Sequence, residues 1–123
     1  MLKSKAIASI FMCAVASGCG SLTVPVVVIS DTGDVMRGTA TAAASGGSFQ
    51  ASGKFNGKPL TCAGTYDSWN TSITISMPVQ CNDGRKGLVI ATREANGIDG
   101  SGRVRLEDGT EADFVFGKAA NAF

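Results

Sequence analysis

Four cysteines carry the most distinctive chemistry in this chain of 123 residues: Cys13, Cys19, Cys62 and Cys81. A thiolate can close a disulfide, bind a metal or act as a nucleophile. The sequence contains no histidine, so it lacks both the commonest general base and the commonest metal ligand. Most hydrolase and zinc chemistry is therefore disfavoured, and the role of each thiol has to be inferred from the residues around it.

Other catalytic or ligand-binding motifs are weak. No Ser-x-x-Lys or Gly-x-Ser-x-Gly pattern marks an activated serine. The glycine-rich stretch 97–103 lacks the Gly-Lys-Ser/Thr ending of a phosphate loop, and a strand, not a helix, is expected after it. Several aspartates occur near glycines, where their side chains favour turns, without the ligand spacing of a calcium loop: Asp31, Asp34, Asp83, Asp99 and Asp108. We expect no metal, no cofactor and no enzymatic activity.

The amino terminus has the three-part layout of a secretory signal peptide. Lys3 and Lys5 precede an uncharged apolar run of ten residues, 6–15, which is followed by the small residues 16–18. A helix that crosses a bilayer needs about 20 apolar residues. The pattern therefore predicts a signal peptide over residues 1–18 and not a permanent transmembrane helix.

The sequence Ala16-Ser17-Gly18-Cys19 resembles the lipobox of bacterial lipoprotein precursors, a resemblance that covers residues 1 to about 20. It implies that Cys19 receives a thioether-linked diacylglycerol and becomes the first mature residue, with its amine commonly acylated as well. Two or three acyl chains make such an anchor durable, whereas one chain holds only marginally. Cys13 does not fit, because the bulky Met12 precedes it, and Gly20 in place of Asp favours the outer membrane. The alternative is a secreted protein whose Cys19 is free or paired.

If Cys13 leaves with the leader and Cys19 carries lipid, Cys62 and Cys81 remain as the one pair in the mature chain. An oxidising envelope compartment favours a structural disulfide between them. Two buried reduced thiols are the alternative. A redox pair is disfavoured because the spacing is far from Cys-x-x-Cys, and two thiols are too few to hold a metal.

Period-two alternation is the main signal in the mature body and predicts β-strands. In the segment 48–56 the inward set is Phe49, Ala51, Gly53 and Phe55, and Asn56-Gly57 predicts a tight hairpin into a return strand over 58–66. The segment 72–81 places one set of residues on a single face, namely Ile73, Ile75, Met77, Val79 and Cys81. Pro78 cannot donate to a ladder, which predicts an edge strand or a bulge there.

Further strands are expected at 24–29, 88–93, 103–107 and 110–116, whereas 35–44 is ambiguous between helix and strand. We therefore predict an all-β fold, a small antiparallel meander of about seven or eight short strands that forms a barrel or a sandwich. The globular domain spans residues 26–123, after a lipidated Cys19 and a short tether over 19–25. Strands this short, with one Trp and one Tyr in the chain, disfavour a transmembrane barrel.

Two surface features could recognise a partner. Tyr66 and Trp69 are the only Tyr and Trp and are expected in one loop, as a recognition loop or as a cap folded onto the core. A basic strip would form if the last strands are neighbours, although a solvated strand face is the plainer interpretation. Its members would be Arg85, Lys86, Arg93, Arg103 and Arg105.

The charge is balanced, with 11 Lys+Arg against 10 Asp+Glu, and disfavours nucleic acid as a partner. The sequence therefore predicts a lipid-anchored lipoprotein of a bacterial envelope, facing the periplasm or the cell surface, which binds or structurally contacts an unidentified envelope protein or glycan. A phage or plasmid exclusion lipoprotein that blocks an envelope receptor or channel is the alternative. An enzyme is disfavoured.

Overall fold

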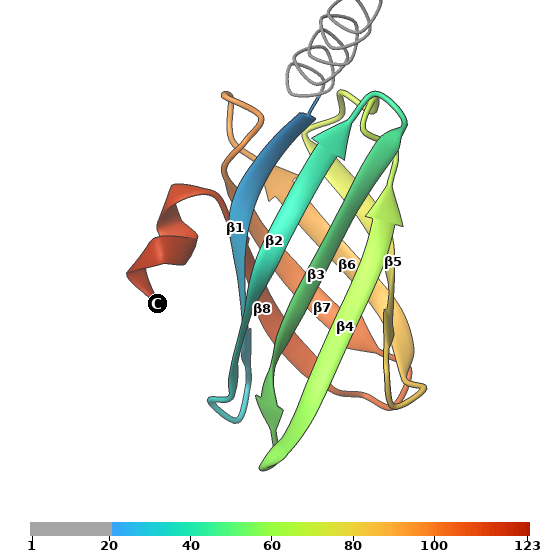
Figure 1. Ribbon diagram of the computed structural model, residues 1–123, viewed down its shortest axis with the longest axis vertical. Helices are drawn as coiled ribbons and strands as arrows, with labels where there is room; N and C mark the ends of the chain where they lie inside the picture. Colours follow the sequence, from blue (N-terminus) through green and yellow to red (C-terminus); the bar gives the residue numbers. More distant parts are fainter. Residues whose placement is uncertain (1–20) are drawn as a thin grey trace, which may run out of the picture.

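The computed structural model describes residues 21–123 as a closed antiparallel barrel in which each strand pairs with the next along the chain and β1 also pairs with β8 (Figure 1). The eight strands are β1 (Ser21–Ser30), β2 (Val35–Ala43), β3 (Gly46–Phe55), β4 (Lys58–Tyr66), β5 (Thr74–Cys81), β6 (Lys86–Arg93), β7 (Gly100–Leu106) and β8 (Glu111–Phe116). A 3-10 helix, η1 (Lys118–Ala122), follows β8. The predicted signal peptide over residues 1–18, with Cys13, and the predicted lipidation site Cys19 lie outside the described residues.

The predicted all-β meander is confirmed, and it closes as a barrel, not a sandwich. The ambiguous segment 35–44 is strand β2, because Thr-rich alternation and pairing on both sides outweigh the helix propensity of its alanines. The predicted hairpin is also confirmed. Asn56 and Gly57 have φ values of 53° and 78°, as the two central positions of a type I′ turn require.

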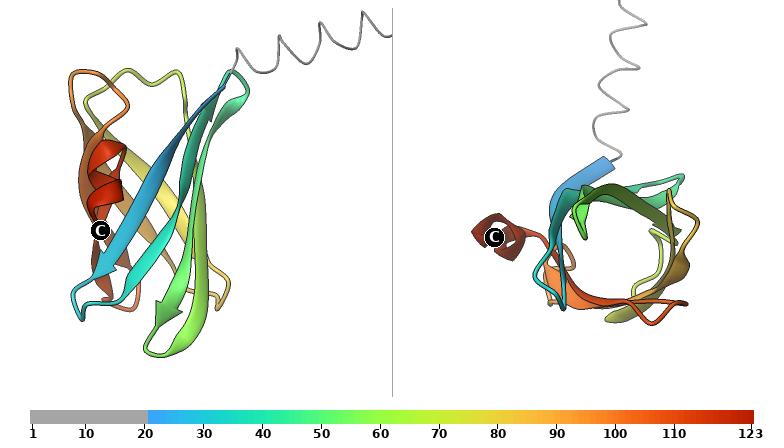
Figure 2. Two further views of the ribbon diagram at one scale, coloured as in Figure 1. Left: turned by 60° about the vertical axis from the view of Figure 1, so that its left-hand side comes forward. Right: turned by 90° about the horizontal axis from the view of Figure 1, so that it is seen from below.

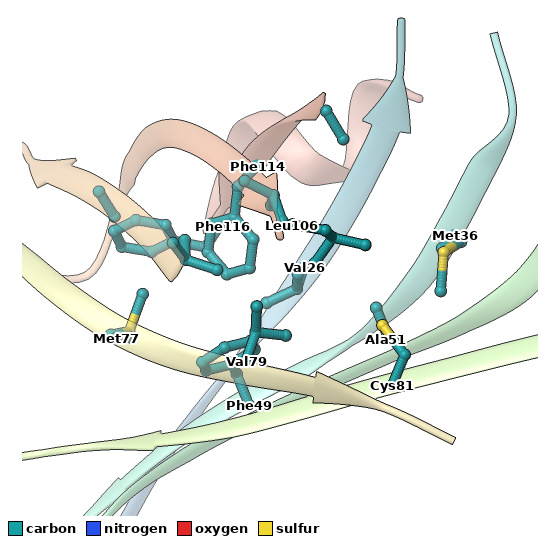
Figure 3. Close-up of a cluster of buried hydrophobic side chains, with 14 of the residues drawn as sticks. Val26, Met36, Phe49, Ala51, Met77, Val79, Cys81, Leu106, Phe114 and Phe116 are labelled. Atoms are coloured by element: carbon teal, nitrogen blue, oxygen red, sulfur yellow. The ribbon is translucent and has the colours of Figure 1, made fainter. Parts of the chain in front are cut away.

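Alternation along the strands separates an apolar interior from a polar wall. The core includes Val89 and also Val26, Phe49, Met77 and Phe114, which are labelled in Figure 3. The intervening positions face outward and are mainly Ser, Thr, Gln and charged residues, as the burial pattern of β5, exposed and buried in strict turn, illustrates.

Glycines opposite aromatic residues shape the interior. Gly64 pairs with Phe49, Gly47 with Tyr66, and Gly100 with Phe116. In each pair the aromatic ring occupies the space that a Cβ on the glycine would need; at Gly100 that Cβ would lie 2.6 Å from Cζ of Phe116. The missing side chains therefore make room for large rings inside a narrow barrel.

The start of β1 corrects the expected tether. Residues 21–25 belong to β1 and pair with β2 from Ser21↔Ala43 onward, so the barrel begins five residues before the expected domain boundary at residue 26. The helix η1 lies outside the wall against β1 (Figure 2), where the amide of Gly117 donates to the carbonyl of Pro25. Arg37 also donates to the carbonyl of Phe123. Val27, which alternation turns outward, is fully buried on this side of the barrel.

The barrel has two ends, named here for later use. The entry end holds Ser21, where the described chain begins, and the connections 44–45, 67–73 and 94–99. The far end holds the turns 31–34, 56–57, 82–85 and 107–110. In Figure 1 the entry end is uppermost. Within residues 21–123 no helix is long and apolar enough to cross a membrane.

Candidate functional site

The barrel interior is largely filled. Phe49 and Phe114, both labelled in Figure 3, meet edge to face with ring centroids 5.4 Å apart. Both rings line each of two small interior cavities. The cavity towards the far end measures about 50 Å³ and the one towards the entry end about 80 Å³. Ligand pockets usually have volumes of about 300 to 1,000 Å³. Each interior cavity is therefore far smaller than a usual ligand pocket.

A disulfide joins Cys62 on β4 to Cys81 on β5, which are directly opposite each other in the sheet. The β4–β5 ladder has three residue pairs, whereas the β3–β4 ladder has nine. The predicted pairing of the two cysteines is confirmed in the structure. The covalent bond lies on the seam where the hydrogen-bonded ladder is shortest.

Pro78 explains where that ladder ends. The amide of Cys81 donates to the carbonyl of Arg85, which lies just before β6. The amide of the next residue, Asn82, donates to the carbonyl of Thr61 on β4. Because amides alternate in direction along a strand, the even-numbered residues of β5 direct their amides towards β4. Pro78 has no N–H to offer there, and pairing stops at Gly64↔Val79. The prediction of an edge strand is wrong, because β5 pairs on both sides; the proline instead leaves the entry-end half of the β4–β5 seam without ladder bonds.

The far end is closed by paired charges and an aromatic ring. The Arg85 guanidinium lies 4.8 Å from the centroid of Phe55, and its Nε donates to Asp83 over 2.8 Å. The backbone amide of Arg85 holds the pKa of Asp83 below its usual value, and the amide of Thr110 does the same for Asp108. These aspartates act as turn residues, as predicted, and the structure shows no group of three or more potential metal ligands within residues 21–123.

The five basic residues do not form one strip. Arg103 binds Asp31 through two parallel contacts of 3.1 Å and also donates to Glu111 and Asp113, each over 2.9 Å. The hydrogen bond to Asp31 is the main reason why the pKa of Arg103 is raised. Arg105 reaches Glu111 at 3.5 Å. This part of the wall is a network of neutralised pairs, in line with the solvated strand face and against a basic binding surface.

Tyr66 and Trp69 are separated in the structure. Tyr66 is the last residue of β4, faces the interior and donates from its hydroxyl to the carbonyl of Thr41 over 3.2 Å. Its burial raises the pKa of the phenol. Trp69 lies in the following connection and is 72% exposed, so the interpretation that it caps the core is wrong. Of the two predicted recognition residues, Trp69 alone faces solvent.

Hydrogen bonds fix the orientation of Trp69 although its ring is exposed. The indole Nε1 donates to the carbonyl of Ala44 over 3.0 Å, and its backbone amide donates to Asp67 over 2.9 Å. The neighbouring Ser68 hydroxyl donates to the carbonyl of Ala43 over 2.6 Å. The connection 67–73 is thus tied across the entry end to the β2–β3 turn.

Arg93 holds the other side of the same connection. Its guanidinium donates to the carbonyls of Asn70 and Ser72, and its backbone amide donates to Ile73 over 2.7 Å. Ile73 was expected on the inward face, but it precedes β5 and is 67% exposed. The period-two pattern ends at Thr74, because the chain at Ile73 still belongs to the connection.

The connection 94–99 completes the entry end. Asn96 accepts the amides of Ile98 and Asp99 and donates to the Asp99 carboxylate. The amide of Lys118 also donates to Asp99, and this bond is the first cause of the lowered pKa of that carboxyl. The stretch 97–103 is therefore a hairpin that enters β7, and Ile98 at its tip is 39% exposed.

A shallow groove on the wall, which sequence reasoning missed, runs over β2 to β5. It encloses about 680 Å³ and is open to solvent. Apart from Ala63, its outward side chains carry hydroxyl and amide groups and no charge: Thr39, Thr41, Ser48, Gln50, Thr61, Thr65, Gln80 and Asn82. Alternating Thr and Ser positions in adjacent strands were visible in the sequence, but only the strand order brings them together.

Comparisons with known proteins find the fold alone. No protein-family model matches the sequence, and neither does any curated protein. A redesigned beta barrel is similar with a TM-score of 0.54 and 14% identity over 78% of this chain and 88% of that chain. A de novo designed fluorescence-activating beta barrel is similar with a TM-score of 0.57 and 18% identity over 76% of this chain and 88% of that chain. The chain therefore shares its architecture with small designed barrels, and its function has to be argued from its own surface.

Proposed function

We propose that this protein is a lipid-anchored lipoprotein of a bacterial cell envelope, held by an acylated Cys19, which binds an envelope protein or glycan through the outside of its barrel. The lipobox-like sequence Ala16–Cys19 supports the anchor. The role is binding or structural contact, not catalysis.

The disulfide is the observation that carries the envelope location. Cytosolic thiols are kept reduced, whereas disulfides form and persist in the bacterial periplasm and at cell surfaces. Cys62 and Cys81 are bonded across the seam with the shortest ladder, where a covalent link adds most to the wall. An oxidising compartment is therefore the environment in which this barrel is complete.

The wall groove over β2 to β5 supports binding on the outside. Its hydroxyl and amide groups can donate and accept hydrogen bonds without the desolvation cost of buried charges. Glycans and uncharged polar protein surfaces present matching groups. The two interior cavities, about 50 and 80 Å³, are much smaller than a typical ligand.

Metabolic labelling with an alkyne analogue of palmitate tests the anchor. We expect the wild-type chain and Cys13→Ala to incorporate the label and Cys19→Ala to lose it. The Cys13→Ala variant is the matched control, because it removes the other thiol near the amino terminus. Labelling that persists in Cys19→Ala would contradict the proposal.

Site-specific photo-crosslinking in intact cells tests the groove. A crosslinking residue replaces Thr65 inside the groove or, as the control, Ser101 on the outward face of β7. We expect an envelope adduct from position 65 that is absent from position 101. Equal yields from both positions, or none from position 65, would remove the groove from the proposal.

A further inference from the structure

Large apolar side chains are exposed together at the entry end. Trp69 is 72% exposed, Ile73 67%, Leu22 47% and Ile98 39%. They make up four of the eight large hydrophobic residues exposed within residues 21–123, and the far end contributes only Val35. Single exposed apolar residues are ordinary, but a group gathered at one end indicates a contact surface.

This surface lies beside the point where the chain enters the barrel. Ser21 pairs with Ala43, and the next carbonyl, that of Ala44, accepts the Trp69 indole. Cys19 is two residues before Ser21, and two extended residues span at most about 7 Å. A lipid on Cys19 therefore brings the bilayer to the rim that carries the exposed apolar residues.

The surface is also preorganised. The Trp69 ring is held through Ala44 and Asp67, and the Arg93 guanidinium fixes the backbone before Ile73. Because the indole N–H already has an acceptor, the ring can enter an apolar boundary without leaving a donor unpaired. Little conformational freedom is left to lose on contact.

We propose that the entry end docks on the bilayer surface, with Trp69 and Ile73 seated at the boundary between headgroups and acyl chains and Leu22 and Ile98 beside them. The inference rests on the proposed lipid anchor at Cys19. The connections 44–45, 67–73 and 94–99 contain three carboxylates and no Lys or Arg. The contact is therefore apolar, of the kind that places Trp at membrane interfaces, and is not an attraction to anionic lipid.

The fluorescence of Trp69, the only Trp in the chain, reports the docking directly. The full chain is expressed with its leader, its acylation is verified by mass spectrometry, and the acylated protein is reconstituted into vesicles of phosphatidylcholine and phosphatidylethanolamine with or without brominated acyl chains. We expect a blue-shifted emission that loses most of its intensity in brominated vesicles and is unchanged by added salt.

A matched control moves the reporter to the other end. The variant Trp69→Phe/Val35→Trp carries its one Trp at the far end, at a position that is 40% exposed in the wild type. We expect no quenching from this variant. Acylated wild-type protein without quenching, or equal quenching from both positions, would overturn the docking and leave the anchor intact. Protein without lipid on Cys19 would overturn the anchor and the docking together.

Discussion

The far end and the entry end of the barrel are finished in different ways. Short turns close the far end, and Arg85 lies over Phe55 among paired aspartates. The entry end has two longer connections with exposed apolar residues, and the β4–β5 ladder stops before reaching it. Charges that are neutralised locally add stability, whereas an apolar rim costs solubility unless something covers it. The far end is thus finished by interactions within the fold, whereas the entry end carries the apolar side chains for which we propose docking on the bilayer.

The largest expected effect on stability comes from Phe114, which lies between the far-end and entry-end cavities of the interior. Phe114 is 2% exposed and packs against Phe49, so Phe114→Ala merges the two cavities. We expect a loss of about 3 to 5 kcal/mol in unfolding free energy, measured by urea denaturation with circular dichroism. Phe123→Ala, at a residue that is 50% exposed, is the control and should change little. A loss below about 1 kcal/mol would mean that the halves are stabilised independently.

The next largest effect concerns the β4–β5 seam, which has ladder pairs towards the far end and none towards the entry end. We expect Cys62→Ala/Cys81→Ala to lose about 3 kcal/mol, because the disulfide closes a separation of 19 residues. Hydrogen exchange should accelerate in β4 and β5 before it does in β1 and β2, whose ladder has nine pairs. Uniform acceleration across the barrel would show that the seam is not its weakest part.

A smaller loss of stability is expected from disrupting the far-end plug, the name used here for Arg85 with Phe55, Asp83 and Asp108. Arg85→Gln removes the contact with the Phe55 ring and the ion pairs to Asp83 and Asp108, and should lower stability by about 1 kcal/mol. Arg105→Gln is the matched control, because that side chain is 75% exposed and makes one contact at 3.5 Å. Equal effects of the two substitutions would argue against a plug.

Acid should weaken both ends. The pKa values of Asp83, Asp99 and Asp108 are lowered in the folded state, so the unfolded chain binds protons more readily at these groups. Their contribution is present above the ordinary value of 3.8 and is lost as the pH falls through the folded pKa values. We therefore expect the Tm to decline when thermal unfolding is followed from about pH 6 down to about pH 2, a range that includes the unfolded-state pKa of these carboxyls. Asp99→Asn should make this decline in Tm less steep. An unchanged dependence of Tm on pH would show that Asp99 does not contribute to the acid sensitivity.

The smallest effect on stability is expected at the entry end. Trp69→Phe should change the unfolding free energy by less than about 0.5 kcal/mol, since the ring is 72% exposed. Tyr66→Phe, at a half-buried residue, should cost about 1 kcal/mol by removing the hydrogen bond to Thr41. A Trp69→Phe variant less stable than Tyr66→Phe would assign the exposed indole a structural role.

The strands could be predicted wherever alternation was regular. The inward faces of 48–56 and 75–81 and the Asn56-Gly57 turn follow from local patterns, and the structure bears them out. The pairing of Cys62 with Cys81 was reached differently, by assigning the other two cysteines to the leader and the anchor, and the disulfide is present. Closure as a barrel could not be chosen over a sandwich, because it depends on β1 meeting β8, about ninety residues apart. The local patterns carry no information on such a distant pairing.

The entry end was harder to predict for a related reason. The direction of Trp69 is decided by the carbonyl of Ala44, 25 residues earlier, and the position of Ile73 by the amide of Arg93. Alternation extended to Ile73 predicted an inward side chain, because nothing in the pattern marks where a strand stops and a connection begins. The charged pairs around Arg103 likewise join residues up to 72 positions apart.

Closure of the sheet also limits how copies of this protein can interact. If the protein is anchored as proposed, its copies meet often on the membrane, and an open sheet edge would invite backbone pairing between molecules. Here β1 and β8 occupy each other's free hydrogen bonds. Closure therefore removes the open sheet edge at which a second copy could pair with residues 26–30, whereas the entry-end half of the β4–β5 seam keeps backbone groups without ladder bonds.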